Sequence, residues 1–305
     1  MGVVALAGGV GGAKLADGLA GVLAPGELTV IVNTGDDFAH FWLKICPDLD
    51  TVCYNLAGLY NLETGWGRAG ESWVSAEEVA VLGGPTWFRL GDRDLATHLE
   101  RTRRLNAGET LSAITADFCR AWGITAKVLP MSDQPVPTMV LTEEGEMAFQ
   151  EYFVARRCEP RVTGFRFENI LQSRPAPGVL EAIRESEAVV ICPSNPWVSI
   201  DPILGVPGVR AALMDAKVVA VSPLVCGKEL KGPAAKMYAE LEIEPSTLAV
   251  ANHYKSLLNG LILDDLDKNL TKLLSLPHLI TDTIMVERDQ RYRLAEEVLS
   301  FAQQL

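Results

Sequence analysis

Short, continuously apolar runs that alternate with helical stretches constrain the fold of this chain of 305 residues more than any other feature. The runs occupy residues 3–7, 28–33, 188–193 and 217–222. Such runs are typical of strands that are buried on both faces of a parallel sheet. The helical stretches occupy residues 15–23, 200–214 and 233–241, and parallel strands are usually joined by such crossover helices. The alternation therefore predicts an α/β fold with a doubly wound, mainly parallel sheet.

The middle of the chain has a different pattern. Two consecutive helices are expected at residues 92–105 and 108–122. Alternating apolar and polar side chains then indicate antiparallel strands at residues 138–142, 147–156 and 163–167. We therefore expect a single unit over residues 1–305. Its core would comprise about residues 1–60 and 175–305, with a smaller α+β subdomain inserted at about residues 60–175.

Charge and cysteine usage exclude several classes of protein. The formal net charge is -12, with 27 Lys and Arg against 39 Asp and Glu. A nucleic-acid or anionic-membrane partner needs clustered positive charge, so neither is expected. No apolar stretch reaches the roughly 18 residues of a membrane span. The six cysteines are scattered and no basic leader precedes the first apolar run, so we expect a cytoplasmic protein with reduced thiols.

A glycine-rich segment, Gly8-Gly9-Val10-Gly11-Gly12-Ala13-Lys14, follows the first apolar run and opens a helix. Glycines let the backbone approach a phosphate closely, and the amides at a helix start point towards it. The segment differs from both the dinucleotide fingerprint and the P-loop, and a tight turn is the alternative interpretation. We favour phosphate binding, with the candidates Gly9, Gly11, Gly12 and Lys14.

Two acidic turns follow in the sequence. Asn33-Thr34-Gly35-Asp36-Asp37 comes after the second apolar run, and Pro47-Asp48-Leu49-Asp50-Thr51 precedes a helix expected at residues 52–59. Each turn alone could be an Asx-turn or a helix cap. Together they bring four carboxylates near the glycine-rich segment, and Mg²⁺ prefers hard oxygen ligands beside phosphate. The candidate metal ligands are Asp36, Asp37, Asp48 and Asp50.

Polar residues also follow the third and fourth apolar runs. In an open parallel sheet, ligands bind outside the carboxyl ends of the strands. Ordinary caps and solvated loops are the alternatives here. The candidate ligand contacts are Ser194, Asn195, Ser199, Lys228 and Lys231. Trp66, Trp73 and Trp87 either pack in the core or form a wall for a flat ring.

Five motifs occur in a specific order: GGVGGAK, NTGDD, ICPDLDT, PSNPWVSIDPIL and SPLVCGKELKGPAAKM. In this order they resemble the CofD/FbiA family, the 2-phospho-L-lactate (or phosphoenolpyruvate) transferases of coenzyme F-420 biosynthesis. The resemblance extends from residue 3 to about residue 264. It implies a Rossmann-like core, a requirement for Mg²⁺ and a homodimer.

The resemblance also implies a reaction. The family transfers the phospho-acid portion of a guanosine diphosphate-linked three-carbon acid to the ribityl hydroxyl of the deazaflavin Fo. GMP leaves, and F-420-0 or its dehydro form results. Such a transfer depends on positioning and electrostatic stabilisation.

The resemblance also implies roles for the site residues. Gly9, Gly11 and Gly12 would hold phosphates, and a carboxylate among Asp36, Asp37 and Asp50 could orient or deprotonate the hydroxyl. By motif position, the candidates that should contact phosphate or the acid group are Ser194, Asn195 and Ser199. Lys228 and Lys231 would neutralise charge.

Two other functions remain open. A family of nucleotide-sugar-binding regulators, of the gluconeogenesis-factor type, has a similar glycine-rich start and Asp-Asp turn. Its members run Asp-Asp-Gly-Gly-Ser there, whereas Phe38-Ala39-His40 follows Asp37 here. They also lack an equivalent of residues 47–50, so both departures favour the transferase. An NAD(P)-dependent oxidoreductase is the third possibility, which Lys14 and the acidic turns disfavour.

Overall fold

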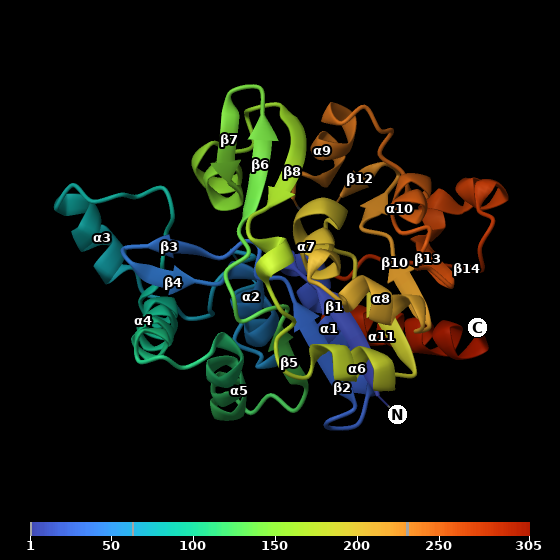
Figure 1. The fold of residues 1–305 in the computed structure, drawn as a ribbon, viewed down its shortest axis with the longest axis horizontal. Coiled ribbons are helices and arrows are strands. Elements are labelled where there is room, and N and C mark those ends of the chain that lie inside the picture. Colours follow the sequence, from blue (N-terminus) through green and yellow to red (C-terminus); the bar gives the residue numbers. More distant parts are fainter. Residues whose placement is uncertain (1, 63, 230–231) are drawn as a thin grey trace.

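The computed structural model describes residues 2–62, 64–229 and 232–305. Within these residues, seven strands form a parallel central sheet in the order β14-β13-β10-β9-β1-β2-β5 (Figure 1). The strands are β1 (Val3–Ala7), β2 (Leu28–Val32), β5 (Lys127–Pro130), β9 (Ala188–Ile191), β10 (Val218–Val221), β13 (Gly260–Asp264) and β14 (His278–Thr281). The predicted α/β class with a mainly parallel sheet is confirmed.

The strand order reverses between β1 and β9. From β1 the chain moves outward through β2 to β5, and from β9 it moves in the other direction through β10 and β13 to β14. This is the topological switch point of a doubly wound sheet, where a crevice opens at the carboxyl ends of the strands. The glycine-rich segment follows β1, and Ser194 and Asn195 follow β9, so these motifs meet at this crevice.

Helices cover both faces of the sheet because side chains of the buried strands alternate between two cores. In β1, Val3, Ala5 and Ala7 join one core, whereas Val4 and Leu6 join the other. The first core contains α1 (Gly9–Val22), α2 (Pro47–Leu56), α5 (Leu111–Ala121) and α11 (Arg288–Gln304). The second contains α6 (Val179–Glu185), α7 (Asp201–Gly205), α8 (Val209–Met214), α9 (Ala234–Glu240) and α10 (Thr247–His253).

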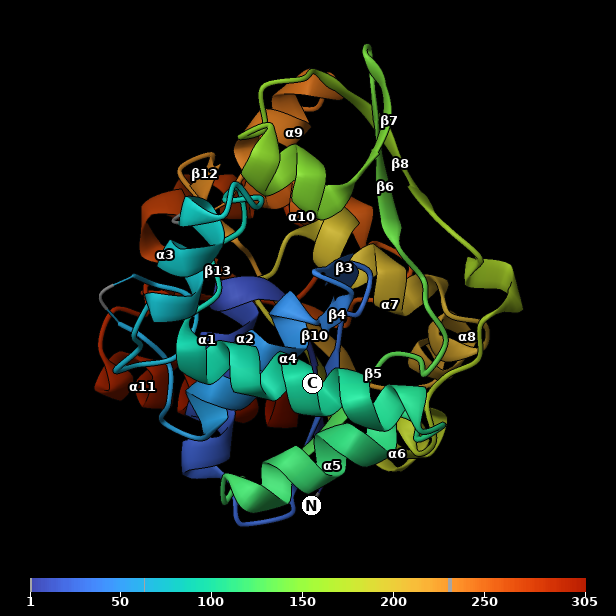
Figure 2. The ribbon, with the colours of Figure 1, turned by 90° about the vertical axis from the view of Figure 1, so that its left-hand side faces the viewer.

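Smaller elements surround the carboxyl end of the sheet. A small antiparallel sheet has the order β7-β6-β8 and stands beyond that end, opposite α3 in the second view (Figure 2). Its strands are β6 (Thr138–Thr142), β7 (Gly145–Ala148) and β8 (Val162–Phe167). The remaining elements are β3 (Phe38–His40), β4 (Leu43–Ile45), α3 (Val74–Val81), α4 (Asp92–Asn106), β11 (Leu224–Val225), β12 (Lys228–Glu229) and the short helical turns η1 (Glu151–Ala155), η2 (Ile170–Gln172), η3 (Pro196–Ile200) and η4 (Asp265–Leu273).

Several elements differ from the sequence-based expectation. The helix expected at residues 52–59 begins at Pro47, so Asp48 and Asp50 lie in its first turn. The helix expected at 200–214 is divided into α7 and α8, because Pro207 and Gly208 interrupt it. Residues 147–156 contain the turn η1 as well as the end of β7.

The range expected to form an insertion, about residues 60–175, contributes β5 to the edge of the central sheet. This strand begins with an exposed lysine and ends with a proline. Both residue types are unusual in a buried strand, so the sequence pattern did not predict β5 as part of the sheet. The division of the chain into a core and an inserted subdomain stays a prediction.

Candidate functional site

A cavity of about 790 Å³ opens at the switch point, where β1, β9 and β10 end. Cavities of this size can enclose a drug-sized ligand. The walls come from segments far apart in the sequence. Those from the predicted motifs include Gly8, Gly9, Val10, Gly11, Lys14, Asp36, Asp48, Ser194, Asn195 and Ser199.

The glycine-rich segment packs tightly against the loop after β9. Ser194 Oγ accepts a hydrogen bond from the Gly8 N–H (3.2 Å) and donates one to the Gly8 carbonyl oxygen (2.8 Å). A Cβ on Gly11 would come closer than 3.0 Å to the Pro193 carbonyl oxygen, and a Cβ on Gly12 would lie 2.5 Å from Ser194 Oγ. Glycine is therefore required here for the junction of two loops, whether or not a phosphate is bound.

Asn33 joins the two acidic turns. Its side-chain amide donates to Asp36 Oδ1 (3.1 Å), to Asp48 Oδ2 (2.9 Å) and to the Val198 carbonyl oxygen (3.0 Å). Asp48 Oδ1 also accepts the Gly9 N–H at 2.7 Å. Asn33 is 0% exposed, and Asp36 and Asp48 are almost as buried. The structure therefore brings Asp36 and Asp48 together at the cavity wall.

Burial raises the pKa of both carboxyls in this pair. The pKa of Asp36 lies well above its ordinary value because of burial first and the charge of Asp48 next. Burial likewise raises the pKa of Asp48 to about 6, against the hydrogen bonds from Asn33 and Gly9, which lower it. Among the described residues, no cationic side chain forms an ion pair with Asp36 or Asp48, and two buried carboxylates that share one amide favour either a proton or a bound cation.

Asp37 and Asp50, the other two predicted carboxylates, do not line the cavity. Asp37 Oδ2 pairs with Lys44 Nζ at 3.1 Å and accepts from Cys46 Sγ, also at 3.1 Å. Asp37 Oδ1 is buried and has no hydrogen-bond partner in the described part of the chain. Asp50 forms a buried ion pair with Arg101 of α4.

The remaining predicted contacts are divided between the cavity and its surroundings. Asn195 Oδ1 caps η3 by accepting the amides of Trp197 and Val198, although Asn195 also lines the cavity. Lys14 lines the cavity and donates from Nζ to the Met285 carbonyl oxygen at 2.6 Å. Lys228 is exposed on β12 and is not part of the wall. Lys231 lies outside the described residues.

Aromatic side chains form two further parts of the wall. Trp66, Trp87 and Phe88 come from the segment between α2 and α4. Phe149 and Phe153 stack on each other, with ring centroids 5.5 Å apart and an interplanar angle of 7°. Trp66 and Trp87 therefore lie where a flat ring could contact them, whereas Trp73 is not part of the wall.

Sequence reasoning missed Asn33, Phe149, Phe153 and Arg89 as residues of this site. Asn33 is the first residue of the motif that contains Asp36, so its place in the sequence could have indicated a role in the site. Phe149 and Phe153 have helical i, i+4 spacing, which the reading of residues 147–156 as a strand concealed. Arg89 lines the cavity near Trp73, with its guanidinium carbon 4.4 Å from that ring centroid.

We expect the raised pKa of Asp48 to appear in the pH dependence of stability. The folded protein holds a proton up to about pH 6 that the unfolded chain releases near pH 4. This group therefore stabilises the metal-free fold below about pH 4, and the contribution falls as the pH rises to about 6. Asp48→Asn should reduce this slope. Urea unfolding of both proteins between pH 4 and pH 7 measures it, and equal slopes would contradict the prediction.

Comparisons with known proteins cover nearly the whole chain. Residues 3–297 match a family model described as 2-phospho-L-lactate transferase CofD. A phosphoenolpyruvate transferase from Streptomyces coelicolor is 43% identical, with 100% of this chain and 99% of the relative covered. Proteins of the same name are 44% identical in Streptomyces griseus, over 98% and 99% of the two chains, and 45% identical in Thermobifida fusca, over 88% and 87%.

A solved structure shares the fold. A member of the UPF0052 family from Bacillus halodurans superimposes with a TM-score of 0.65 over 98% of this chain and 99% of its own. Its sequence is only 17% identical, so the likeness concerns the fold alone. In the residues that the structure describes, we find no helix with the length and hydropathy that crossing a membrane requires.

Proposed function

Because the chain belongs to the 2-phospho-L-lactate transferase CofD family, and is thus a transferase, we propose that it transfers a phospho-three-carbon-acid group to the ribityl hydroxyl of the deazaflavin Fo. The donor would be a guanosine diphosphate-linked acid, and GMP would leave. The observation that carries the proposal is the position of Asp36 and Asp48 beside the glycine-rich segment in one large cavity.

The relatives favour one three-carbon acid over the others. Three of them that are 43–45% identical are named phosphoenolpyruvate transferases. We therefore propose enolpyruvyl phosphate as the group transferred and the dehydro form of F-420-0 as the product. Phospholactate remains the second donor to test.

The residues of the site fit a magnesium ion. Asp36 and Asp48 supply hard oxygen ligands at the cavity wall, and neither forms an ion pair with a cationic side chain in the described part of the chain. Asp36 and Asp48 would hold the ion, whereas Asp37 pairs with Lys44 and does not line the cavity. When bound, Mg²⁺ would neutralise charge on the diphosphate oxygens of the donor.

The chain's own groups bind the donor and move the proton. Backbone amides in the first turn of α1, at Val10 and Gly11, have no carbonyl acceptor within the helix and lie at the cavity wall, so they would donate to phosphate oxygens. Ser199 lines the same wall and would supply a hydroxyl for the phosphate or the acid group, and Ser194 would do so by exchanging its hydrogen bond to the Gly8 carbonyl oxygen. Lys14 adds positive charge to the wall of the same cavity.

Asp36 is our choice for the group that orients the attacking hydroxyl. Asn33 contacts its Oδ1, so Oδ2 would accept the hydroxyl proton. The hydroxyl oxygen forms a bond to the phosphorus that carries the acid, and the bond from this phosphorus to the oxygen of the GMP phosphate breaks. A carboxylate with a raised pKa is the stronger base once it is ionised.

The proposal predicts a defined product. Purified protein incubated with Fo, Mg²⁺ and guanylylated phosphoenolpyruvate should form dehydro-F-420-0 and GMP in equal amounts, as measured by mass spectrometry. Guanylylated phospholactate and phosphoglycerate serve as competing donors, and a chelator should abolish transfer. Absence of an F-420-0-type product with every donor would contradict the proposal. Tight guanine-nucleotide binding without turnover would instead favour a regulator.

A further inference from the structure

A buried charge cluster joins α4 to α2 outside the cavity. Arg101 of α4 donates two hydrogen bonds to Asp50 of α2, from Nη1 to Oδ2 at 3.0 Å and from Nη2 to Oδ1. Arg101 is 2% exposed and Asp50 is 5% exposed. The pair is therefore shielded from water, and each charge depends on the other for its neutralisation.

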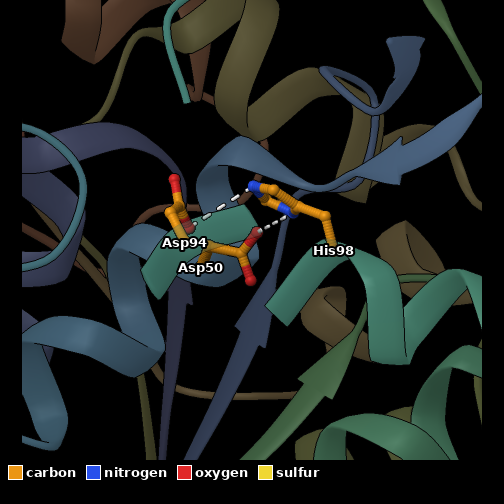
Figure 3. Close-up of side chains that lie close together, drawn as sticks. All are labelled: Asp50, Asp94 and His98. Carbon is orange, nitrogen blue, oxygen red and sulfur yellow. Dashed lines mark ion pairs between the residues drawn. The ribbon is translucent and has the colours of Figure 1, made fainter. Parts of the chain in front are cut away.

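His98 and Asp94 extend the cluster along α4. His98 lies between two carboxylates, with Nδ1 3.6 Å from Asp50 Oδ2 and Nε2 3.3 Å from Asp94 Oδ1 (Figure 3). Ligand-type atoms of Asp50, Asp94 and His98 all lie within 4.8 Å of one another. Their residue types alone would suit a metal ion.

The positions that a metal ion would use are already occupied by protein donors. Both oxygens of Asp50 accept hydrogen bonds from Arg101, and Asp94 Oδ1 accepts one from the Tyr54 hydroxyl at 2.6 Å. A cation at the cluster would also meet the guanidinium charge. The geometry is that of a buried salt bridge that holds α2 and α4 together.

The Arg101–Asp50 pair is connected to both acidic turns of the site. Asp50 stands two residues after Asp48, which binds Gly9 and Asn33 from the same first turn of α2. Arg101 Nη1 also donates to the Lys44 carbonyl oxygen at 3.3 Å, and Lys44 pairs with Asp37. Arg101 thus contacts the first turn of α2, which carries Asp48. It also contacts the backbone of Lys44, whose side chain pairs with Asp37.

We propose that Arg101 and Asp50 are positioning residues: their buried pair fixes the first turn of α2 so that Asp48 reaches the cavity. Asp50 acts through this pair and touches neither the substrate nor the reacting atoms. The inference rests on the proposed function for its activity measurement. Its structural part, the pair itself, is independent of which group is transferred.

A charge-neutral double variant tests the inference. Asp50→Asn and Arg101→Gln each leave one buried charge without its partner, so each should lower the melting temperature and reduce kcat by up to about 10²-fold through misplacement of Asp48. The double variant Asp50→Asn/Arg101→Gln restores a neutral hydrogen-bonded pair. It should regain most of the melting temperature and kcat within about tenfold of wild type. Glu100→Gln/Arg103→Gln removes an exposed pair on α4 and is the matched control.

The outcomes distinguish a positioning role of Asp50 from a direct role in the reaction. A double variant with the wild-type melting temperature but the low kcat of Asp50→Asn would overturn the inference, because Asp50 would then act on the reaction directly. If the double variant does not fold, a crystal structure of the wild-type protein soaked with Mn²⁺ decides. Asp50 paired with Arg101 supports the inference, and Asp50 ligating Mn²⁺ overturns it. A wild-type protein that transfers nothing counts against the proposed function, whereas the melting temperatures and the Mn²⁺ structure still test the pair.

Discussion

Replacing Gly11 with alanine is expected to lower kcat/KM by at least about 10²-fold, a large effect for one methyl group. The new Cβ would overlap the Pro193 carbonyl oxygen, which belongs to the backbone and has no rotamer that could relieve the contact. The loops after β1 and β9 would have to separate, and they carry the α1 amides and Ser194.

Helix propensity acts in the opposite direction but is too small to compensate. Alanine favours a helix over glycine by about 1 kcal/mol, whereas overpacking of a tight site costs about 1–3 kcal/mol or more. We therefore expect a small net loss of stability together with the large loss of activity. Steady-state kinetics and thermal unfolding measure the two effects separately.

Gly164→Ala is the matched control for this change. A Cβ on Gly164 in β8 would be 3.5 Å from Leu141 Cδ1, an ordinary van der Waals contact, and Gly164 does not line the cavity. Its kcat/KM should stay within about twofold of wild type. If Gly11→Ala also kept wild-type kcat/KM, the tight junction of the two loops would not be needed for the reaction.

The sequence predicted four of the five inner strands of the sheet, which are buried on both faces; the fifth, β13, is equally buried but was not predicted. The runs that became β1, β2, β9 and β10 are continuously apolar because helices cover both sides of each strand. The edge strands β5 and β14 have no such run. Each is covered by fewer neighbours and contains polar residues, so the rule that found the central strands could not find them.

The site was predictable to the level of its motifs but not of its individual side chains. Glycine-rich and acidic turns were expected at the ends of strands, and the switch point brings Gly9, Asp36, Asp48 and Ser194 to one cavity. The sequence could not distinguish Asp48 from Asp50. Two residues of a helix differ by about 200° around its axis, so only one of the two faces the cavity. The partner of Asp50 is Arg101, 51 positions later, and no local pattern indicates such a pair.

Asp36→Asn is the substitution that tests the candidate chemistry most directly, and it should lower kcat by roughly 10³-fold, or about 4 kcal/mol in the activation barrier. Asparagine has nearly the same volume, and its oxygen can still accept the hydrogen bond from Asn33. The fold should therefore persist while the charge and the proton acceptor disappear. Removal of a carboxylate from this pair should also relieve repulsion with Asp48, so the metal-free variant should be at least as stable as wild type at pH 7.

The measurements are kcat as a function of Mg²⁺ concentration and thermal unfolding with and without the ion. Asp36→Asn should combine low kcat with a smaller Mg²⁺-induced rise in melting temperature. Asp215→Asn, at the exposed end of α8, is the control and should change neither quantity. A stabilised variant with low kcat would show that the charge of Asp36, and not its packing, matters for the reaction, because the loss of packing contacts lowers stability. Wild-type kcat in Asp36→Asn, with an unchanged response to Mg²⁺, would exclude Asp36 both as a ligand and as the proton acceptor.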